Sequence, residues 1–430
     1  MTSENHPVAI IGAGPAGCCL ACLLALRGIH CLVYDNDKRP GLMVGESLVP
    51  AVIPILRKLG IEERVAKISV SKPGASFFHA SGTRVHLKFQ KRGANQPGYA
   101  YNVPRPQFDN ILRERAEELG VRFINHRAVV QKSTSSEREI ELAPESLQAA
   151  GLDTTQHPRW LLDGSGRTRL FARTLDIDAQ KGERFDVSYF AHFENFTHDE
   201  VEDGQIIISI LNHGWSWRIP LQGKLSVGVV IDKNAAKLYG DTPEQRLEKI
   251  ISTDPLLKEK STNARRVSDV MVYTNYQLIS KRSHGPGWMM LGDAFGFVDP
   301  MLSPGLFMAL ESARLLDDLV FSHGVPTSDE PAGVKQYGHD LLHWHHAWQE
   351  LINYFYDGRI LRMYEAGSKL AMDKGKWNPA KIMERHVQRV IQAMASGAAT
   401  RSGYNRRLID FTARRLIWDV PDAEFFSVKQ

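Results

Sequence analysis

The 430-residue chain lacks the features of secreted, membrane-spanning or nucleic-acid-binding proteins. Its four cysteines all fall within the first 31 residues, whereas a disulfide framework would scatter them, so we expect reduced thiols and a cytoplasmic location. The apolar run at 18–26 is far shorter than the about 20 residues that cross a bilayer, and the glycines before it do not suit a signal peptide. A net charge of +4 is too small to indicate nucleic acid. We expect neither a membrane span nor a metal site.

A glycine-rich turn follows the first apolar strand, residues 8–11. Gly12 permits a tight turn, Gly14 leaves room for a pyrophosphate at the backbone, and Gly17 lets the next helix pack closely on the sheet. Asp35 ends the next strand, eighteen residues after Gly17, where its carboxylate can accept hydrogen bonds from a ribose. The helix N-terminus then faces the phosphates. We therefore predict dinucleotide binding, with contacts from Gly12, Gly14, Ala16, Gly17 and Asp35.

Beyond this turn the periodicity of the apolar residues changes along the chain. Hydrophobic residues make up 43% and charged residues 24%, as in globular proteins, and the length allows two or three cores. Strands first alternate with helices, and short alternating runs separated by turns then predict an antiparallel sheet. These runs are residues 187–193, 205–211, 215–220 and 225–231. A helix start follows, with Thr242 as cap, Pro243 at the first position and Gln245 completing a capping box.

We expect an α/β fold with three parts. A Rossmann-type dinucleotide-binding domain is discontinuous, an antiparallel-sheet substrate domain is inserted into it, and a helical region follows a linker at 326–333. The dinucleotide-binding domain is expected at 1–70, 98–178 and 275–325, the substrate domain at 71–97 and 179–274, and the helical region at 326–430.

Three further segments carry residues suited to a flavin. Asp293 follows a strand and precedes a helix, where it can bind a ribityl hydroxyl while the helix N-terminus points to an isoalloxazine ring. Arg105 stands just before a helix, and Glu46 and Ser47 lie in a polar loop. In this order the segments resemble the FAD-dependent monooxygenase superfamily, which implies a glutathione-reductase-type FAD fold. The resemblance implies FAD contacts from Glu46, Ser47, Arg105, Asp293, Pro300, Gly305 and Leu306.

The segment 214–220, Gly-Trp-Ser-Trp-Arg-Ile-Pro, separates members of this superfamily. It resembles the Trp-x-Trp-x-Ile-Pro motif that lies near the flavin in flavin-dependent halogenases. The matching residues are Trp215, Trp217, Ile219 and Pro220. Two alternatives stay open. One is an ordinary strand with aromatic side chains on one face. The other is a prenyl reductase, because those enzymes carry a related motif with Tyr and Phe.

Lys72 stands in the segment 71–78, Ser-Lys-Pro-Gly-Ala-Ser-Phe-Phe, which resembles the catalytic-lysine segment of the halogenases. The resemblance implies that its amine holds hypohalous acid formed at the flavin and presents it to the substrate. A hydrophobic wall from Ala75, Phe77 and Phe78 would favour the neutral amine, because burial disfavours an ammonium ion. The alternative is a solvated surface lysine.

Residues 300–306 match the loop whose backbone amides bind halide in these enzymes, with one departure. Pro304 stands where the family commonly has Ser or Thr, and proline has no N–H to donate. Halide would then bind the amides of Gly305 and Leu306, aided by the helix dipole. The loop has no glutamate near Leu302, and the chain is too short for the insertions of tryptophan halogenases. The phenol- and pyrrole-type halogenases are therefore the expected subgroup.

The resemblance implies an FADH2-dependent halogenase served by a separate flavin reductase. O2 and chloride or bromide would give hypohalous acid, which halogenates a phenol or pyrrole, either free or tethered to a carrier protein. Residues 359–415 contain thirteen Lys or Arg and only four Asp or Glu. This basic excess is either a docking surface for an acidic carrier or a solvated face without a partner.

Three other functions stay open. An aromatic hydroxylase that reduces its own flavin with NADPH would explain Pro304. The tryptophan strand suits a prenyl-type double-bond reductase, and a flavin-binding partner of a carrier protein would have no turnover of its own.

Overall fold

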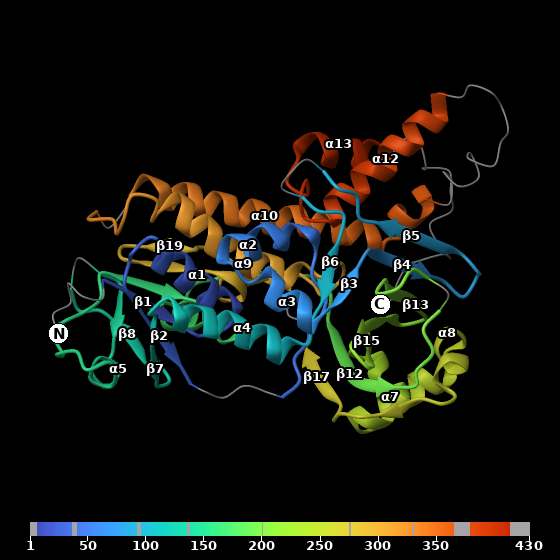
Figure 1. Ribbon diagram of the computed structural model, residues 1–430, viewed down its shortest axis with the longest axis horizontal. Coiled ribbons are helices and arrows are strands. Elements are labelled where there is room, and N and C mark those ends of the chain that lie inside the picture. The colour runs from blue at the N-terminus through green and yellow to red at the C-terminus, as the bar shows by residue number, and fades with distance from the viewer. Residues whose placement is uncertain are drawn as a thin grey trace.

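The computed structural model contains a parallel sheet packed against helices, a larger and mostly antiparallel sheet, and a group of C-terminal helices (Figure 1). This architecture confirms the predicted fold class. The structure describes residues 7–36, 41–92, 96–135, 138–199, 201–274, 277–328, 331–364 and 379–412.

The parallel sheet has the strand order β19-β20-β10-β1-β2-β7. All neighbours run parallel except β19, which pairs antiparallel with β20 at one edge. Every residue of β1, β2 and β10 is buried, as expected of parallel strands covered on both faces. The strands are β1 (Val8–Ile11), β2 (Cys31–Asp35), β7 (Arg122–Asn125), β10 (Trp160–Asp163), β19 (His284–Gly285) and β20 (Trp288–Met290).

Helix α1 (Pro15–Leu26) packs against both α4 (Arg105–Glu118) and α9 (Pro304–Leu319). Because it is covered by other elements, apolar residues surround it instead of forming one stripe. Its three cysteines and Cys31 in β2 are buried and free, as predicted. Helix α9 begins at Pro304, because proline suits the first position of a helix.

The larger sheet contains the predicted alternating runs as neighbouring strands. Its order is β16-β12-β15-β14-β13-β4-β5, with β17 also paired to β12. All pairs are antiparallel except β13 with β4, which run parallel. The strands are β4 (Gly74–Phe78), β5 (Arg84–Lys88), β12 (Asp186–Glu194), β13 (Ile206–Leu211), β14 (Gly214–Leu221), β15 (Lys224–Asp232), β16 (Arg265–Arg266) and β17 (Met271–Thr274).

Small sheets lie where the expected domains meet. Strand β3 (Val70–Lys72) pairs with β6 (Ala100–Asn102), so the expected limit between residues 70 and 71 falls inside a strand. Strands β11 (Ala179–Lys181), β18 (Leu278–Ser280) and β21 (Gly296–Phe297) form a second small sheet that links the expected substrate and dinucleotide-binding segments. The domain limits stay a prediction.

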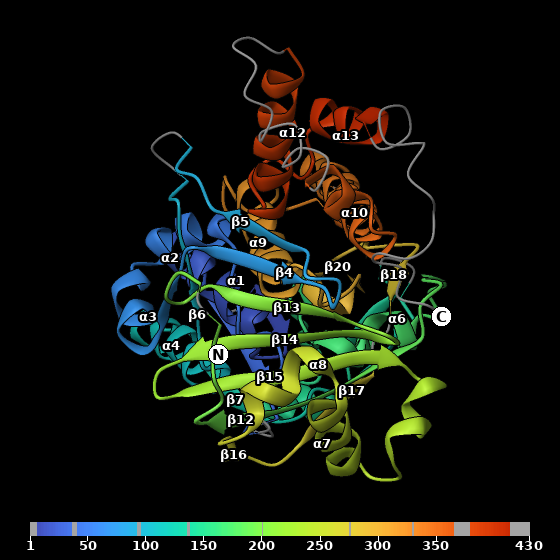
Figure 2. The ribbon, with the colours of Figure 1, turned by 90° about the vertical axis from the view of Figure 1, so that its right-hand side faces the viewer.

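The C-terminal helices pack beside the segment that follows β5 (Figure 2). They are α10 (Ala332–Tyr356), α12 (Pro379–Ala395) and α13 (Gly403–Phe411). Arg92 donates a 2.6 Å hydrogen bond to the carbonyl of Arg389 in α12, and Gln96 donates one of 2.7 Å to Ser396. Helix α10 begins inside the expected linker, and residues 365–378 and 413–430 of the expected helical region lie outside the described residues.

A separate apolar core lies under α7 (Pro243–Thr253) and α8 (Pro255–Lys258), against β12 and β15. The predicted capping box of α7 is confirmed, since Thr242 Oγ1 accepts from the Gln245 N–H and Gln245 Oε1 accepts from the Thr242 N–H. No helix among the described residues has the length and apolar character needed to span a bilayer. The other elements are η2 (Pro50–Val52), α2 (Ile53–Leu59), α3 (Glu62–Ile68), β8 (Val130–Lys132), β9 (Ile140–Leu142), α5 (Pro144–Ala149), η3 (Gly166–Thr168), α6 (Leu170–Thr174), η4 (Ala235–Tyr239), η5 (Glu259–Ser261) and η6 (Gly292–Ala294).

Candidate active site

The three glycines of the N-terminal turn have different geometries. Gly12 has a φ of +103°, and a Cβ there would overlap the backbone of Gly164. A Cβ at Gly17 would overlap the carbonyl oxygen of Gly12, so only glycine allows this approach of α1 to β1. Gly14 has an ordinary extended backbone, with a φ of −76°, and no atom within 4 Å of a Cβ built there. In this turn Gly12 therefore has the positive φ, and Gly14 is the glycine with open space next to its backbone.

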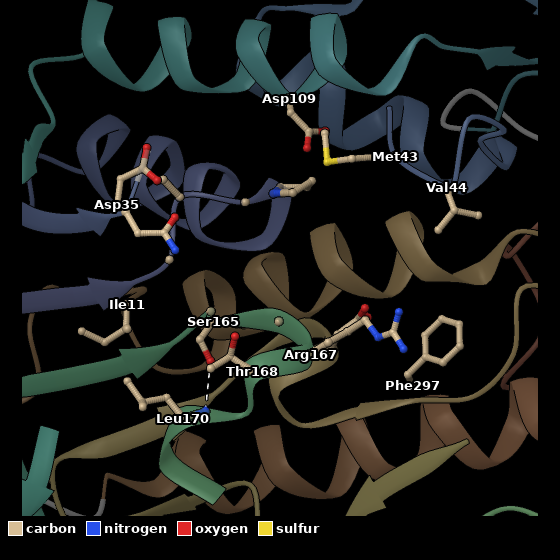
Figure 3. Close-up of a pocket in the computed structure, with 18 of the residues that line it drawn as sticks. Ile11, Asp35, Met43, Val44, Asp109, Ser165, Arg167, Thr168, Leu170 and Phe297 are labelled. Carbon is tan, nitrogen blue, oxygen red and sulfur yellow. Dashed lines mark hydrogen bonds between the residues drawn. The ribbon is translucent and has the colours of Figure 1, made fainter. Parts of the chain in front are cut away.

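A cavity of about 520 Å³ begins at this turn. Asp35 from the end of β2 and Ser165 and Arg167 from the loop after β10 line it (Figure 3). Asp35 also forms an ion pair with Arg113 of α4. Asp163 fixes the loop after β10, because its carboxylate accepts from the N–H groups of Ser165 and Phe171 at 2.9 and 2.8 Å. Sequence reasoning missed Ser165 and Arg167, although Asp-Gly-Ser-Gly at the end of a central strand was the available signal.

Arg105 and Asp293 both line this cavity. Arg105 donates to both carboxylate oxygens of Asp109, at 3.0 and 3.1 Å, and to the Val44 carbonyl at 2.6 Å. Enclosure away from water raises the pKa of Asp293 to about 6, although the charges of Arg167 and Arg105 act in the opposite direction. Asp293 can therefore accept or donate a hydrogen bond near neutral pH.

A second cavity of about 220 Å³ continues from the first and shares Gly14, Arg105, Asp293 and Pro300 with it. Trp215, Trp217 and Ile219 of β14 line this second cavity, whereas Pro220 is not among its lining residues. The remaining apolar lining residues include Phe190, Ile206, Ile208, Leu302, Leu306 and Ala309. The predicted near-flavin strand thus forms a wall opposite the start of α9, with the two indole rings 5.8 Å apart.

The start of α9 has an unusual backbone. Leu302 and Ser303 have φ values of +66° and +60°, which are costly for residues with a side chain. Pro304 then takes the first helical position, and Gly305 and Leu306 line the second cavity. The first N–H groups of a helix have no partner within it, so the amides of Gly305 and Leu306 are the donors that this end can offer. Although Pro304 has no N–H, the amides of Gly305 and Leu306 therefore remain as donors.

Lys72 is buried behind the second cavity, with 2% of its surface exposed. Its Nζ lies 2.7 Å from Ser47 Oγ, which lines the cavity, and 2.8 Å from the Leu48 carbonyl oxygen. Burial lowers the pKa of Lys72 to about 7. The ring that its Nζ faces, at 5.2 Å, is that of Phe89.

The predicted aromatic wall has a different composition. Phe77 stacks on Phe355 of α10 with ring centroids 5.0 Å apart, and Phe78 meets His86 edge-on. Lys72 is buried, but Phe89 and not the expected Phe77 and Phe78 provides its aromatic contact, because Lys72 lies on β3 while Phe77 and Phe78 lie on β4.

Glu46 has a partner that sequence reasoning missed. Its side chain is 2% exposed, lines the second cavity, and has Oε1 2.9 Å from Nε2 of His192 in β12. Periodicity within one strand gave no signal for this contact. Within the described part of the chain, no group of three or more His, Cys, Asp or Glu residues is arranged to hold a metal ion.

We expect the stability difference between the parent and Lys72→Met to depend on pH. The folded state holds Lys72 with a pKa of about 7, while the unfolded chain has the usual 10.5. The parent therefore loses stability relative to the variant as pH falls from 10.5 to about 7, and the loss is complete below that. Between pH 10 and pH 6 the difference should change by on the order of 4 kcal/mol.

Urea unfolding of both proteins at the two pH values measures this change. Lys281→Met, which replaces an exposed lysine, is the control and should show no comparable change. A Lys72→Met difference that is the same at both pH values would contradict the lowered pKa.

The fold and the two cavities define a dinucleotide-binding flavoprotein class. A family model described as an FAD binding domain matches residues 5–317. The chain is 29% identical to tryptophan 2-halogenase of Chondromyces crocatus over 73% of this chain and 60% of that protein. It is 26% identical to the 1H-pyrrole-2-carbonyl-[peptidyl-carrier protein] chlorinase of Pseudomonas fluorescens over 84% and 86% of the two chains.

Solved structures share the fold. The flavin-dependent brominase Bmp2 superposes with a TM-score of 0.77 at 22% identity, over 96% of this chain and 98% of that one. The chain belongs to the FAD-binding domain family and, within it, to the flavin-dependent halogenase family. It is therefore a flavin-dependent oxidoreductase, as predicted.

Proposed function

We propose that the protein is an FADH2-dependent halogenase that acts on an electron-rich aromatic ring, a phenol or a pyrrole. The observation that carries this proposal is the buried Lys72, whose pKa near 7 leaves much of its amine neutral. The Ser47 hydroxyl lies 2.7 Å from this amine, and Ser47 lines the cavity that the tryptophan strand and the start of α9 also line. Hydroxylation of a ring needs no amine at that point.

The first cavity fits FAD because an open glycine and a helix N-terminus meet in its wall. The turn from Gly12 through Ala16 to Gly17 would hold the pyrophosphate. Asp35 would hold a ribose, and Arg105 and Asp293 the ribityl chain. The remaining proposed FAD contacts are Glu46, Ser47, Pro300, Gly305 and Leu306. When bound in its reduced form, FAD would supply two electrons and two protons, with which O2, one further proton and halide give hypohalous acid and water.

Chloride or bromide would bind at the start of α9. The amides of Gly305 and Leu306 donate hydrogen bonds to the anion, and the positive end of a 16-residue helix favours negative charge there. Leu302 and Leu306 give the site apolar walls that exclude water.

Lys72 would hold the hypohalous acid. A neutral amine has two N–H bonds and one lone pair, and Ser47 Oγ and the Leu48 carbonyl oxygen can accept the two N–H bonds. For the lone pair to accept the O–H of hypohalous acid, the acid must pass the Ser47 side chain, because Lys72 itself does not line the cavity. In the transfer step a carbon–halogen bond forms and the halogen–oxygen bond breaks. The ring proton and the hydroxide leave together as water.

We propose a substrate that is either free or tethered to a carrier protein, and a separate flavin reductase as the source of FADH2. Two relatives act, by their names, on a pyrrole borne by a peptidyl-carrier protein. In the described helical region, Arg401 and Arg406 pair with Asp340 and Glu350 of α10, so part of the basic excess is neutralised within the protein. The free buried thiols support a cytoplasmic location.

The test combines the protein with a flavin reductase, NADH, FAD, bromide and a set of phenols and pyrroles, free and carrier-bound. We expect a product with the paired isotope pattern of bromine in its mass spectrum. Hydroxylated product alone at high bromide, with NADPH oxidation in the absence of a reductase, would instead identify an aromatic hydroxylase. Anaerobic reduction of an isoprenoid would identify a prenyl-type reductase. Carrier binding without oxygen consumption would identify a partner protein without turnover.

A further inference from the structure

The loop before α9 is fixed by a buried carboxylate that has three hydrogen-bond donors. Asp299 Oδ1 accepts from the backbone N–H of Met301 at 2.8 Å and from the hydroxyl of Tyr356 at 3.0 Å. Asp299 Oδ2 accepts from Gln277 Nε2 at 3.0 Å. Asp299 is fully buried and directly precedes Pro300, which lines both cavities.

Tyr356 connects this carboxylate to the tryptophan strand. Its hydroxyl oxygen accepts a 2.9 Å hydrogen bond from Trp215 Nε1 while its O–H donates to Asp299. Burial and the nearby charge of Asp299 raise the pKa of Tyr356, so the phenol keeps the proton that it donates. The Arg184 guanidinium lies 3.8 Å from the centre of the Tyr356 ring and is itself paired with Asp186, which fixes the ring from its face.

These contacts lie next to a strained stretch of backbone. Leu302 and Ser303 both have positive φ, and the Ser303 side chain makes no capping hydrogen bond. Such a conformation is unfavourable for a residue with a side chain and persists only where its surroundings hold it. The bond from Met301 to Asp299 fixes the residue immediately before this pair. Tyr356 in turn fixes the carboxylate relative to β14.

We propose that Tyr356 is a positioning residue that ties the tryptophan strand to the loop before α9, and so sets the direction of the Gly305 and Leu306 amides for halide binding. This inference rests on the proposed function, because it assigns a role within the same halide site. Tyr356 itself is not among the lining residues of either cavity, and it acts through Asp299 and Trp215.

The matched pair of variants is Tyr356→Phe and Tyr354→Phe. Both tyrosines lie on α10 and donate to a buried or partly buried carboxylate, but Tyr354 donates to Asp410 of α13, away from the cavities. Tyr356→Phe removes both the hydrogen bond to Asp299 and the one from Trp215. We expect this variant to bind FAD as the parent does but to need about tenfold more bromide for half-saturation. Tyr354→Phe should match the parent in both.

Bromide titration of the FAD-loaded protein, followed by flavin absorbance, measures binding without turnover, and the KM for bromide and kcat follow in the coupled assay. The expected signature is a raised KM with a nearly unchanged kcat. Trp215→Phe should weaken bromide binding likewise, and the double variant should be no weaker than the worse single one. If Tyr356→Phe does not fold, the same titration with Trp215→Phe and Asp299→Asn decides. Asp299→Asn should stay near the parent, because its amide oxygen still accepts from Met301 and Tyr356 and the Gln277 amide can turn over to accept from the new NH2 group.

The outcomes separate the two proposals. A parent that binds bromide and halogenates, together with a Tyr356→Phe variant of parental bromide affinity, would overturn this inference alone. Equal weakening in Tyr354→Phe would also overturn it, because the effect would then be a general loss of stability. A parent that binds FAD but shows neither a bromide response nor halogenated product would overturn the proposed function and this inference with it.

Discussion

Lys72→Met should consume oxygen and oxidise FADH2 at nearly the parental rate while its halogenated product falls by about a hundredfold or more, the scale expected when a positioned catalytic group is lost. The reason is spatial, because the halide donors at the start of α9 do not include Lys72, which lies behind Ser47. The oxidant would form and then escape. Monochlorodimedone in the medium should trap the escaped oxidant. Product mass measures halogenation, and oxygen uptake measures oxidant formation.

Two controls define this result. Lys281→Met replaces an exposed lysine and should keep parental product. Lys72→Arg keeps a cation but cannot lose its proton, so it should also fail to give product if the neutral amine is required. A Lys72→Met enzyme that halogenates as well as the parent would rule out the assigned role. A Lys72→Met enzyme that is slower but releases no oxidant would show that Lys72 only shapes the pocket.

Gly14→Val should fold and yet lose measurable FAD binding. The backbone at Gly14 is extended and a Cβ there meets no protein atom, so valine causes no strain in the protein itself. Its side chain would instead enter the cavity next to the N-terminus of α1, in the space that a pyrophosphate needs. Flavin fluorescence titration with circular dichroism on the same samples measures both properties.

Gly403→Val is the matched control, because Gly403 also has open space around a Cβ but lies at the start of α13. It should bind FAD normally. Gly17→Val should behave differently from both, since its Cβ would overlap the carbonyl of Gly12 and prevent folding. Normal FAD affinity in Gly14→Val would remove the assignment of this cavity to the cofactor.

Features set by local geometry could be predicted from the sequence. The glycine turn, the capping box at Thr242 and the alternating strands each depend on residues a few positions apart. The parallel pairing of β13 with β4 could not be predicted, because periodicity shows which face of a strand is buried and not which strand lies beside it.

The candidate site shows the same division. Motif resemblance brought out Lys72, but its contacts are Ser47 and Leu48, 25 and 24 residues away, and no spacing rule links them. Tyr356 lies 141 residues from Trp215, and neither position predicts the other. From the sequence, Pro304 counts as a missing N–H donor. In the structure it occupies the first position of α9, where the helix itself needs no N–H.

The parallel pairing of β13 with β4 also constrains the order in which the chain can fold. Strand β4 and its hairpin partner β5 leave the ribosome early, but Ala75 pairs with Ile206, about 130 residues later. At typical synthesis rates, roughly 7 to 26 seconds pass before β13 is made and can pair with the free edge of β4. During that interval the uncharged strand β4 has unpaired backbone groups along its free edge, which is the arrangement that recruits other strands. The free edge of β4 is therefore open to pairing with other chains between the synthesis of β5 and that of β13.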